Sequence, residues 1–298
     1  MSFEDIVGNE KNKKLFEVII KENKITNGYI FIGQESIGKL LFAKEFAKAI
    51  LCTNKQKPCN KCKSCIEFNT FNNPDFNIIN PDGNNIKIEQ IRELVKKAYE
   101  KPIVSNRKVY IINNSNLMTK EAQNSLLKTL EEPPEYITII LISSNENMFL
   151  PTIKSRCTKI LFNKLSDEEI KLVLKKEYNY TNIPEVIFDV AKGSIKKVVE
   201  LKDKQQQYEN IKKIFFNLEK INIIDLINSK EDIFKDKEQS ITLLEHINLI
   251  FFDKIKINAK YLKCIKIVED TKDRLKSNSN FDMSIDNFML NIWEEING

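Results

Sequence analysis

The sequence is poor in the two residues that interrupt helices. Its 298 residues include only seven glycines and eight prolines, the last proline is Pro184, and no glycine lies between Gly193 and Gly298. No convincing strand-like run follows residue 164 either. Together these absences argue against a β-rich C-terminal region and predict several packed helices there.

Long apolar runs are also missing. Nowhere does the chain carry the run of about 18 or more uncharged apolar residues that a membrane-spanning helix needs. The N-terminus, MSFEDIVGNE, lacks the basic region and apolar stretch of a signal peptide. We therefore expect a cytoplasmic protein.

Histidine is nearly absent, and the charge is close to balanced. His246, the only histidine, has no serine or cysteine constellation near it in the sequence, so we expect it to pack within the helical region. The 47 basic and 42 acidic residues leave a net charge of +5, which by itself does not indicate nucleic-acid binding.

The first half of the chain alternates strand and helix patterns. Residues 29–33, 108–112 and 137–143 predict buried strands, and residues 39–51, 88–101 and 119–132 predict helices, the last with Thr119 as N-cap. Such alternation predicts an α/β fold with a mainly parallel sheet. Ser166 and Glu169 form a capping-box pattern that starts a further helix. We expect domains over residues 1–163, 164–203 and 204–298.

The segment FIGQESIGKLLFAKEF contains a phosphate-loop pattern with one departure. Gly33, Gly38 and Lys39 match Gly-x-x-x-x-Gly-Lys, and a predicted strand and helix flank them as that loop requires. A plain strand-to-helix turn is the alternative. Leu40 stands where a serine or threonine would ligate magnesium, so Mg²⁺ is not expected at this loop.

The acidic partner of a hydrolytic site is missing as well. The strand 108–112 runs into Asn113 and Asn114, neither of which brings a carboxylate to hold magnesium or polarise water. Two parts of the hydrolytic apparatus are therefore absent. Whether ATP binds without being hydrolysed stays open.

Four cysteines lie close together, although nothing predicts secretion or a disulfide framework. The segment 52–65 carries a C-x6-C-x2-C-x2-C pattern. Four thiolates suit a tetrahedral, structural zinc ion; an iron–sulfur cluster and free thiols are the alternatives. The ligands would be Cys52, Cys59, Cys62 and Cys65. Lysines 55, 57, 61 and 63 form either a basic patch or ordinary solvated charge.

Arg156 follows the strand pattern 137–143 and precedes a β-like exit segment. A lone loop arginine is usually a surface charge, but this one is expected at the rim of a nucleotide-binding type of sheet. Its neighbour Cys157 is interpreted as a small packed residue rather than a metal ligand.

Several segments together resemble one family. SLLKTLEEPP (125–134), PTIKSRC (151–157), FEDIVGNE (3–10), the cysteine segment and AKGSIKKVVEL (191–201) stand in the order seen in bacterial clamp-loader subunits of the AAA+ class. The resemblance covers about residues 1–203 specifically. It is closest to the degenerate, delta-prime type of DNA polymerase III clamp-loader subunit.

The resemblance implies an AAA+ domain with an inserted zinc module, a helical lid and a helical collar domain for oligomerisation. It further implies a ring with motor (tau/gamma) and delta subunits that loads the sliding clamp onto primed DNA. Arg156 corresponds to the arginine finger that acts in trans on the ATP of a neighbouring subunit. Lys196 stands in place of the lid's sensor arginine. Residues 143–145 match a γ-phosphate sensor region.

Two other functions remain open from the residues. One is an autonomous ATPase that tolerates Leu40 and Asn113, which predicts hydrolysis by the chain alone. The other is a zinc-dependent nucleic-acid-binding module, which predicts salt-sensitive DNA binding that disappears when zinc is stripped.

Overall fold

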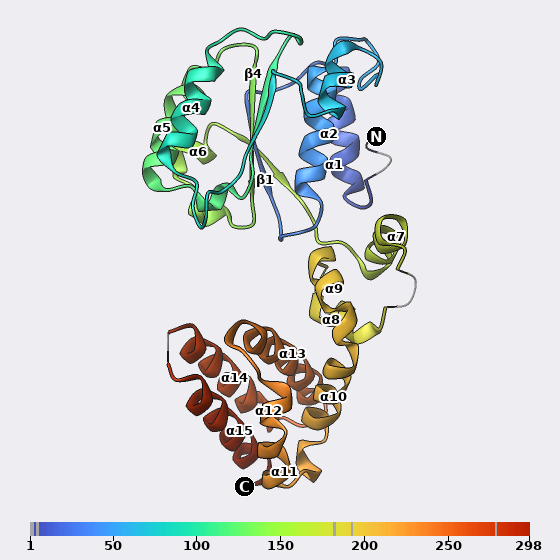
Figure 1. Ribbon diagram of the computed structural model, residues 1–298, viewed down its shortest axis with the longest axis vertical. Coiled ribbons are helices and arrows are strands. Elements are labelled where there is room, and N and C mark those ends of the chain that lie inside the picture. Colours follow the sequence, from blue (N-terminus) through green and yellow to red (C-terminus); the bar gives the residue numbers. More distant parts are fainter. Residues whose placement is uncertain (1–2, 4–5, 181–182, 192, 278) are drawn as a thin grey trace. The chain divides into compact units, whose positions relative to one another are not determined.

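Five strands form one parallel sheet in the computed structural model of the chain (Figure 1). Their order in the sheet is β2-β3-β4-β1-β5, and every pair is parallel. The strands are β1 Gly28–Ile32, β2 Phe76–Ile79, β3 Lys108–Ile112, β4 Ile137–Ser143 and β5 Thr158–Leu161. The predicted parallel α/β sheet is therefore confirmed. The edge strand β2 was not predicted.

The structure describes residues 3, 6–180, 183–191, 193–277 and 279–298. Glu4, Asp5 and Lys192, which belong to segments 3–10 and 191–201, lie outside the described residues. The chain divides into two compact units, a first unit Met1–Asn179 and a second unit Tyr180–Gly298. The three domains expected from the sequence stay a prediction. Among the described residues, no helix is long and apolar enough to cross a membrane.

Helices cover both faces of the sheet in the first unit, with α1 and α2 on one face and α4 and α5 on the other (Figure 1). The helices of this unit are α1 Glu10–Lys21, α2 Lys39–Leu51, α3 Lys63–Asn69, α4 Ile88–Ala98, α5 Lys120–Glu131, α6 Pro151–Lys154 and α7 Asp167–Tyr178, with 3-10 turns η2 Ser115–Leu117 and η3 Glu146–Met148. Two predicted caps are present: Thr119 Oγ1 accepts from Ala122 N at the start of α5, and Ser166 and Glu169 form the capping box of α7.

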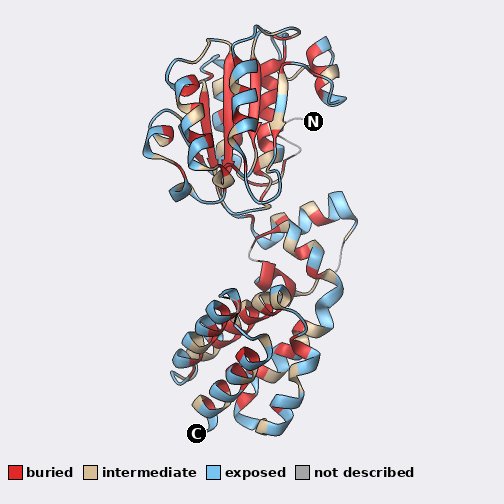
Figure 2. Ribbon diagram, turned by 60° about the vertical axis from the view of Figure 1, so that its left-hand side comes forward, coloured by how far each residue is buried: buried red, intermediate tan, exposed pale blue. Residues whose placement is uncertain are grey.

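Alternation along β1 builds two different cores. Tyr29 and Phe31 point to the α1–α2 face, where Phe16 lies 6.1 Å and 5.5 Å from them between ring centroids. Ile30 points to the other face and joins the aliphatic cluster of α4 and α5. The central strands β1, β3 and β4 are buried on both sides (Figure 2), as a parallel sheet between helices requires.

All regular elements of the second unit, within its described residues, are helical. They are α8 Glu185–Ala191, α9 Ile195–Leu201, α10 Gln205–Phe216, α11 Ile223–Asn228, α12 Lys230–Ile233, α13 Lys237–Ile255, α14 Tyr261–Lys276 and α15 Phe281–Asn297, with 3-10 turns η4 Lys202–Lys204 and η5 Leu218–Lys220. Phe215 is fully buried and packs against Phe251 and Phe288, so α10, α13 and α15 share one core. The predicted helical C-terminal region is confirmed.

Candidate functional site

The loop between β1 and α2 has the backbone of a strand–turn–helix junction. Gly33 follows β1 directly, and a Cβ atom at this position would lie 2.6 Å from the carbonyl oxygen of Phe162, so only glycine fits without a shift. Gly38 caps α2 in the left-handed region at φ 89°. Lys39 is the first residue of α2. The loop thus has the form that can present backbone N–H groups to an anion.

Lys39 is turned back onto its own loop. Its Nζ donates to the carbonyl oxygen of Gly33 at 2.5 Å and also to that of Gln34. Burial lowers the pKa of Lys39 to about 8, while the carboxylate of Glu35 opposes this shift. Glu35 also places a negative charge within the loop, and its Oε1 accepts from Ser144 Oγ at 3.4 Å. The ammonium group of Lys39 is therefore hydrogen-bonded to oxygens of its own loop.

The residues around the loop lack the hydroxyl and the carboxylate that hold magnesium in active phosphate loops. Leu40, the second residue of α2, has only an apolar side chain. At the end of β3, Asn113 donates through Nδ2 to Asn80 Oδ1 at 3.1 Å, and Asn114 adopts a left-handed conformation at φ 49°. Neither asparagine supplies a carboxylate.

Residues 143–145 lie next to the loop. The carbonyl oxygen of Ser143 accepts from Gly33 N at 3.2 Å. The buried Oγ of Ser143 donates to the carbonyl oxygen of Asn145 at 2.9 Å. Asn145 Oδ1 accepts from Asn147 N at 2.9 Å. These polar groups satisfy one another, which favours a structural role for the segment.

Arg156 is held by three protein groups. Its Nη2 lies 2.9 Å from Oε1 of Glu131, the last residue of α5, while Nη1 donates to the Thr152 carbonyl at 2.9 Å and to Ser155 Oγ at 3.2 Å. One third of the Arg156 side chain remains exposed. The contacts orient the guanidinium, and its planar fork retains N–H groups for a further acceptor.

Arg156 lies at the edge of the sheet opposite to its own phosphate-type loop. In the parallel register of β1 with β5, Tyr29 is opposite Thr158 and Ile32 is opposite Leu161. Arg156 precedes β5, whereas Gly33 follows β1. At about 3.3 Å per residue, the two positions are separated by the length of the strands, more than about 10 Å. The Arg156 side chain is therefore too far from the Gly33 loop to contact a group bound there.

The four clustered cysteines converge on one point. The sulfur atoms of Cys52, Cys59, Cys62 and Cys65 all lie within 4.8 Å of one another, and the Cys52 and Cys62 sulfurs are 4.0 Å apart. Four sulfurs each about 2.3 Å from a central ion would be about 3.8 Å apart, so the donor set fits a tetrahedral metal ion. All four ligand positions are supplied by protein.

Hydrogen bonds to the sulfur of Cys59 favour its thiolate form. Cys62 N donates to Cys59 Sγ at 3.3 Å and Asn54 Nδ2 donates to the same atom at 3.0 Å. Backbone donors, first that of Lys61, lower the pKa of Cys59 to about 6. Burial instead raises the pKa of Cys65 to about 12. A cation among the sulfurs would offset this cost of burying thiolates.

Three other residues singled out in the sequence have plainer surroundings. Lys196 lies on α9 in the second unit, is largely exposed, and has Glu200 Oε1 3.7 Å from its Nζ. Cys157 packs beside Gly28, and burial raises its pKa to about 12. His246 is 3% exposed, with its ring 5.1 Å from the ring of Tyr208.

Two charged residues of the site were not predicted. Glu131 belongs to the LEEPP segment at the end of the predicted helix 119–132, and its ion pair with Arg156 depends on a tertiary contact between α5 and the segment after α6. Glu35 occupies one of the unspecified positions of Gly-x-x-x-x-Gly-Lys, to which the pattern assigns no role. An acidic residue inside a phosphate-loop pattern is a signal that the sequence did offer.

Comparison with protein families gives one family match. The model described as "DNA polymerase III, delta subunit" matches residues 8–166, which is more than half of the chain. The match covers the sheet, the cysteine segment and Arg156.

Curated relatives point to the same group of proteins. DNA polymerase III subunit gamma/tau of Mycoplasma genitalium is 34% identical over 212 residues, which cover 68% of this chain and 35% of that protein. DNA polymerase III subunit delta' of Bacillus subtilis is 35% identical over 159 residues, 53% of this chain and 48% of that protein. The aligned part spans less than half the length of either relative.

Among solved structures, the chain resembles a DNA polymerase III gamma subunit-related protein from Thermotoga maritima. The TM-score is 0.52 at 19% identity, and the alignment covers 94% of this chain and 99% of that one. At this identity the likeness supports the fold alone.

Proposed function

Because this chain belongs to the DNA polymerase III delta-subunit family of clamp-loader proteins, we propose that it is the non-motor, delta-prime type of subunit. In this role it helps to load the sliding clamp onto primed DNA. It supplies an arginine to the ATP site of a neighbouring subunit and hydrolyses no ATP itself. Its partners are the motor (tau/gamma) and delta subunits.

The chemistry of its own loop supports a non-motor role. ATP hydrolysis in phosphate-loop proteins uses a hydroxyl and a carboxylate to hold magnesium, and here those positions carry Leu40 and Asn113 with Asn114. Lys39, which would reach the outer phosphates, donates instead to the loop carbonyls of Gly33 and Gln34. Gly33, Gly38 and Lys39 are then a retained scaffold. Any nucleotide held there would be structural.

The position of Arg156 is the observation that carries the proposal. The guanidinium lies at the edge of the sheet away from the Gly33 loop, is partly exposed, and is oriented by Glu131, Thr152 and Ser155. A group so placed cannot serve its own loop but can meet a phosphate presented by another subunit. Its positive charge would stabilise the negative charge that develops on the transferred phosphoryl group.

The cysteine cluster is proposed to hold a structural Zn²⁺ ion. An iron–sulfur cluster would have to fit several iron and sulfide atoms between the four thiolates, and sulfurs within 4.8 Å of one another leave room for a single ion. With four protein ligands the ion has no open position for water. Zinc would fix the loop between α2 and α3.

Lys196 and the residues from 164 onward have proposed roles that follow the same family. Lys196 would take the place of a lid sensor residue, with a point charge instead of a bidentate fork. Residues 164–203 would form the lid, and residues 204–298 the collar through which the subunits assemble.

Reconstitution tests the proposal. The chain is mixed with motor and delta subunits, sliding clamp and primed DNA, and ATP hydrolysis is measured with and without it. We expect clamp- and DNA-stimulated ATP hydrolysis only when this chain is present. The chain alone should hydrolyse no ATP. Hydrolysis by the chain alone, abolished by Lys39→Ala, would instead support an autonomous ATPase.

A further inference from the structure

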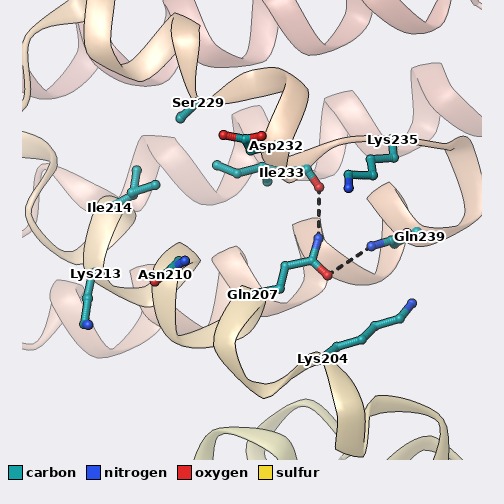
Figure 3. Close-up of a pocket in the computed structure, with 10 residues that line it drawn as sticks. All are labelled: Lys204, Gln207, Asn210, Lys213, Ile214, Ser229, Asp232, Ile233, Lys235 and Gln239. Carbon is teal, nitrogen blue, oxygen red and sulfur yellow. Dashed lines mark hydrogen bonds between the residues drawn. The ribbon is translucent and has the colours of Figure 1, made fainter.

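The second unit contains a groove to which the proposed function assigns no ligand. It lies between α10 and the α11–α12 segment, has a volume of about 780 Å³, and is open to solvent (Figure 3). This volume falls within the range of about 300–1,000 Å³ that is usual for ligand sites. The α10 residues line one side of the groove, and residues 229–235 line the other.

The floor of the groove is apolar and ordered. Ile214 of α10 and Ile233 of α12 both line it. Gln207 connects the two sides, because its Nε2 donates to the Ile233 carbonyl at 3.3 Å while its Oε1 accepts from Gln239 Nε2 at 3.1 Å. These bonds hold α10, α12 and the start of α13 together, so the groove is a preformed feature.

Three lysines surround this floor without an acidic partner. Lys204, Lys213 and Lys235 are exposed and form no ion pair with any described residue, although many other lysines of the chain do. Asp232 is the only acidic side chain in the lining. The groove thus combines a positive rim with an apolar base.

We propose that this groove binds an acidic peptide segment of a protein partner, with one apolar side chain of the peptide resting on Ile214 and Ile233. Carboxylates of the segment would pair with Lys204, Lys213 and Lys235. Such a surface gains affinity from the buried apolar side chain and selectivity from the charges.

Two features favour a peptide over a nucleic acid. No aromatic side chain lines the groove, so it has no platform on which bases can stack. The carboxylate of Asp232 lies within the lining and can accept hydrogen bonds from the N–H groups of a peptide backbone, which a sugar-phosphate backbone lacks.

The test uses the full chain and a fluorescein-labelled polyglutamate peptide with one central leucine, followed by fluorescence anisotropy. A peptide with serine in place of the leucine and a labelled single-stranded DNA oligonucleotide are measured in parallel. The groove variant is Lys213→Glu with Lys235→Glu. Lys220→Glu with Lys260→Glu is the matched control, because these lysines are exposed in the same unit and lie outside the groove. Thermal unfolding followed by circular dichroism verifies that both variants fold.

We expect the leucine peptide to bind, to bind less tightly as salt rises, and to lose roughly tenfold in affinity in the groove variant but not in the control. Replacing the leucine should also weaken binding. The proposal is overturned if the peptide does not bind, if both variants bind it equally, or if serine replaces leucine without loss. DNA binding that shows the groove-specific loss while the peptide fails would assign the groove to nucleic acid instead.

Discussion

Nη2 of Arg156 lies 2.9 Å from Oε1 of Glu131, and this ion pair joins the segments LEEPP and SRC, both within the residues that match the family. Glu131 ends α5, and Arg156 follows α6. The pair is partly exposed, so its contribution to stability is small, on the order of 1 kcal/mol or less. Its importance would be to aim the guanidinium.

Removing the carboxylate tests this orienting role. In Glu131→Gln we expect the free energy of unfolding to change by less than about 1 kcal/mol, since the pair is solvated. The stimulated ATPase of the reconstituted assembly should fall, but less than in Arg156→Ala, because the guanidinium is still present. Glu132→Gln, at the neighbouring exposed position, is the control. Equal activity of Glu131→Gln and wild type would show that the pair does not orient Arg156.

The chain alone should hydrolyse no ATP. Leu40 and Asn113 leave magnesium without the hydroxyl and the carboxylate that hold it in active phosphate loops. Phosphate release by the purified chain should equal that of a Lys39→Ala variant. A rate above this background that vanishes in Lys39→Ala would contradict the non-motor assignment.

Metal analysis of the purified chain should find one zinc ion per chain. In the native state, the four clustered cysteines should be protected from thiol reagents by the metal, and a chelator should expose them. Replacing one ligand in Cys62→Ser should abolish stoichiometric zinc binding, whereas Cys264→Ser, outside the cluster, should preserve it. Iron with sulfide, or unprotected thiols at all four positions, would refute the zinc site.

Acid should destabilise the second unit through His246. Burial lowers the pKa of His246 to about 4 from its ordinary 6.5. The folded state therefore binds this proton less readily than the unfolded state. Its contribution is fully present above about pH 6.5 and is lost as the pH falls toward 4, by up to about 3 kcal/mol.

The matched variant for this prediction is His246→Phe, which keeps a ring against Tyr208 but cannot take up a proton. Between pH 6.5 and 4, the unfolding free energy of wild type should fall more steeply than that of the variant, as measured by urea denaturation. Parallel pH profiles of the two proteins would show that His246 is not the buried neutral group described here.

Much of the first unit could be predicted because its signals are local. Strands β1, β3 and β4 are dense in isoleucine, valine and tyrosine, and Thr119 precedes α5 at the N-cap position. Strand β2 was missed because FNII is short and lies at the sheet edge, with only Ile79 buried. Its identity as a strand depends on pairing with β3, which is a tertiary contact.

The candidate site shows the same limit. Spacing alone indicated the four cysteines as candidate metal ligands and the two glycines as a phosphate-loop pattern, because both patterns lie within a few residues of sequence. The sequence could not show that Arg156 and Gly33 lie at opposite edges of the sheet, because this depends on the parallel register of β1 and β5. Nor could it show that Lys39 is turned onto its own loop.

The most direct test of the account is the ATPase of the reconstituted clamp loader with Arg156→Ala in place of wild type. Arginine fingers contribute about 10³ to 10⁵ in rate at the site they complete. We predict that the clamp- and DNA-stimulated hydrolysis at the adjoining motor subunit is lost, and that Arg156→Lys, which keeps the charge but not the planar fork, restores little of it. Unchanged stimulated hydrolysis in an assembly shown to contain Arg156→Ala would contradict the central claim that this chain acts through its neighbour's ATP site.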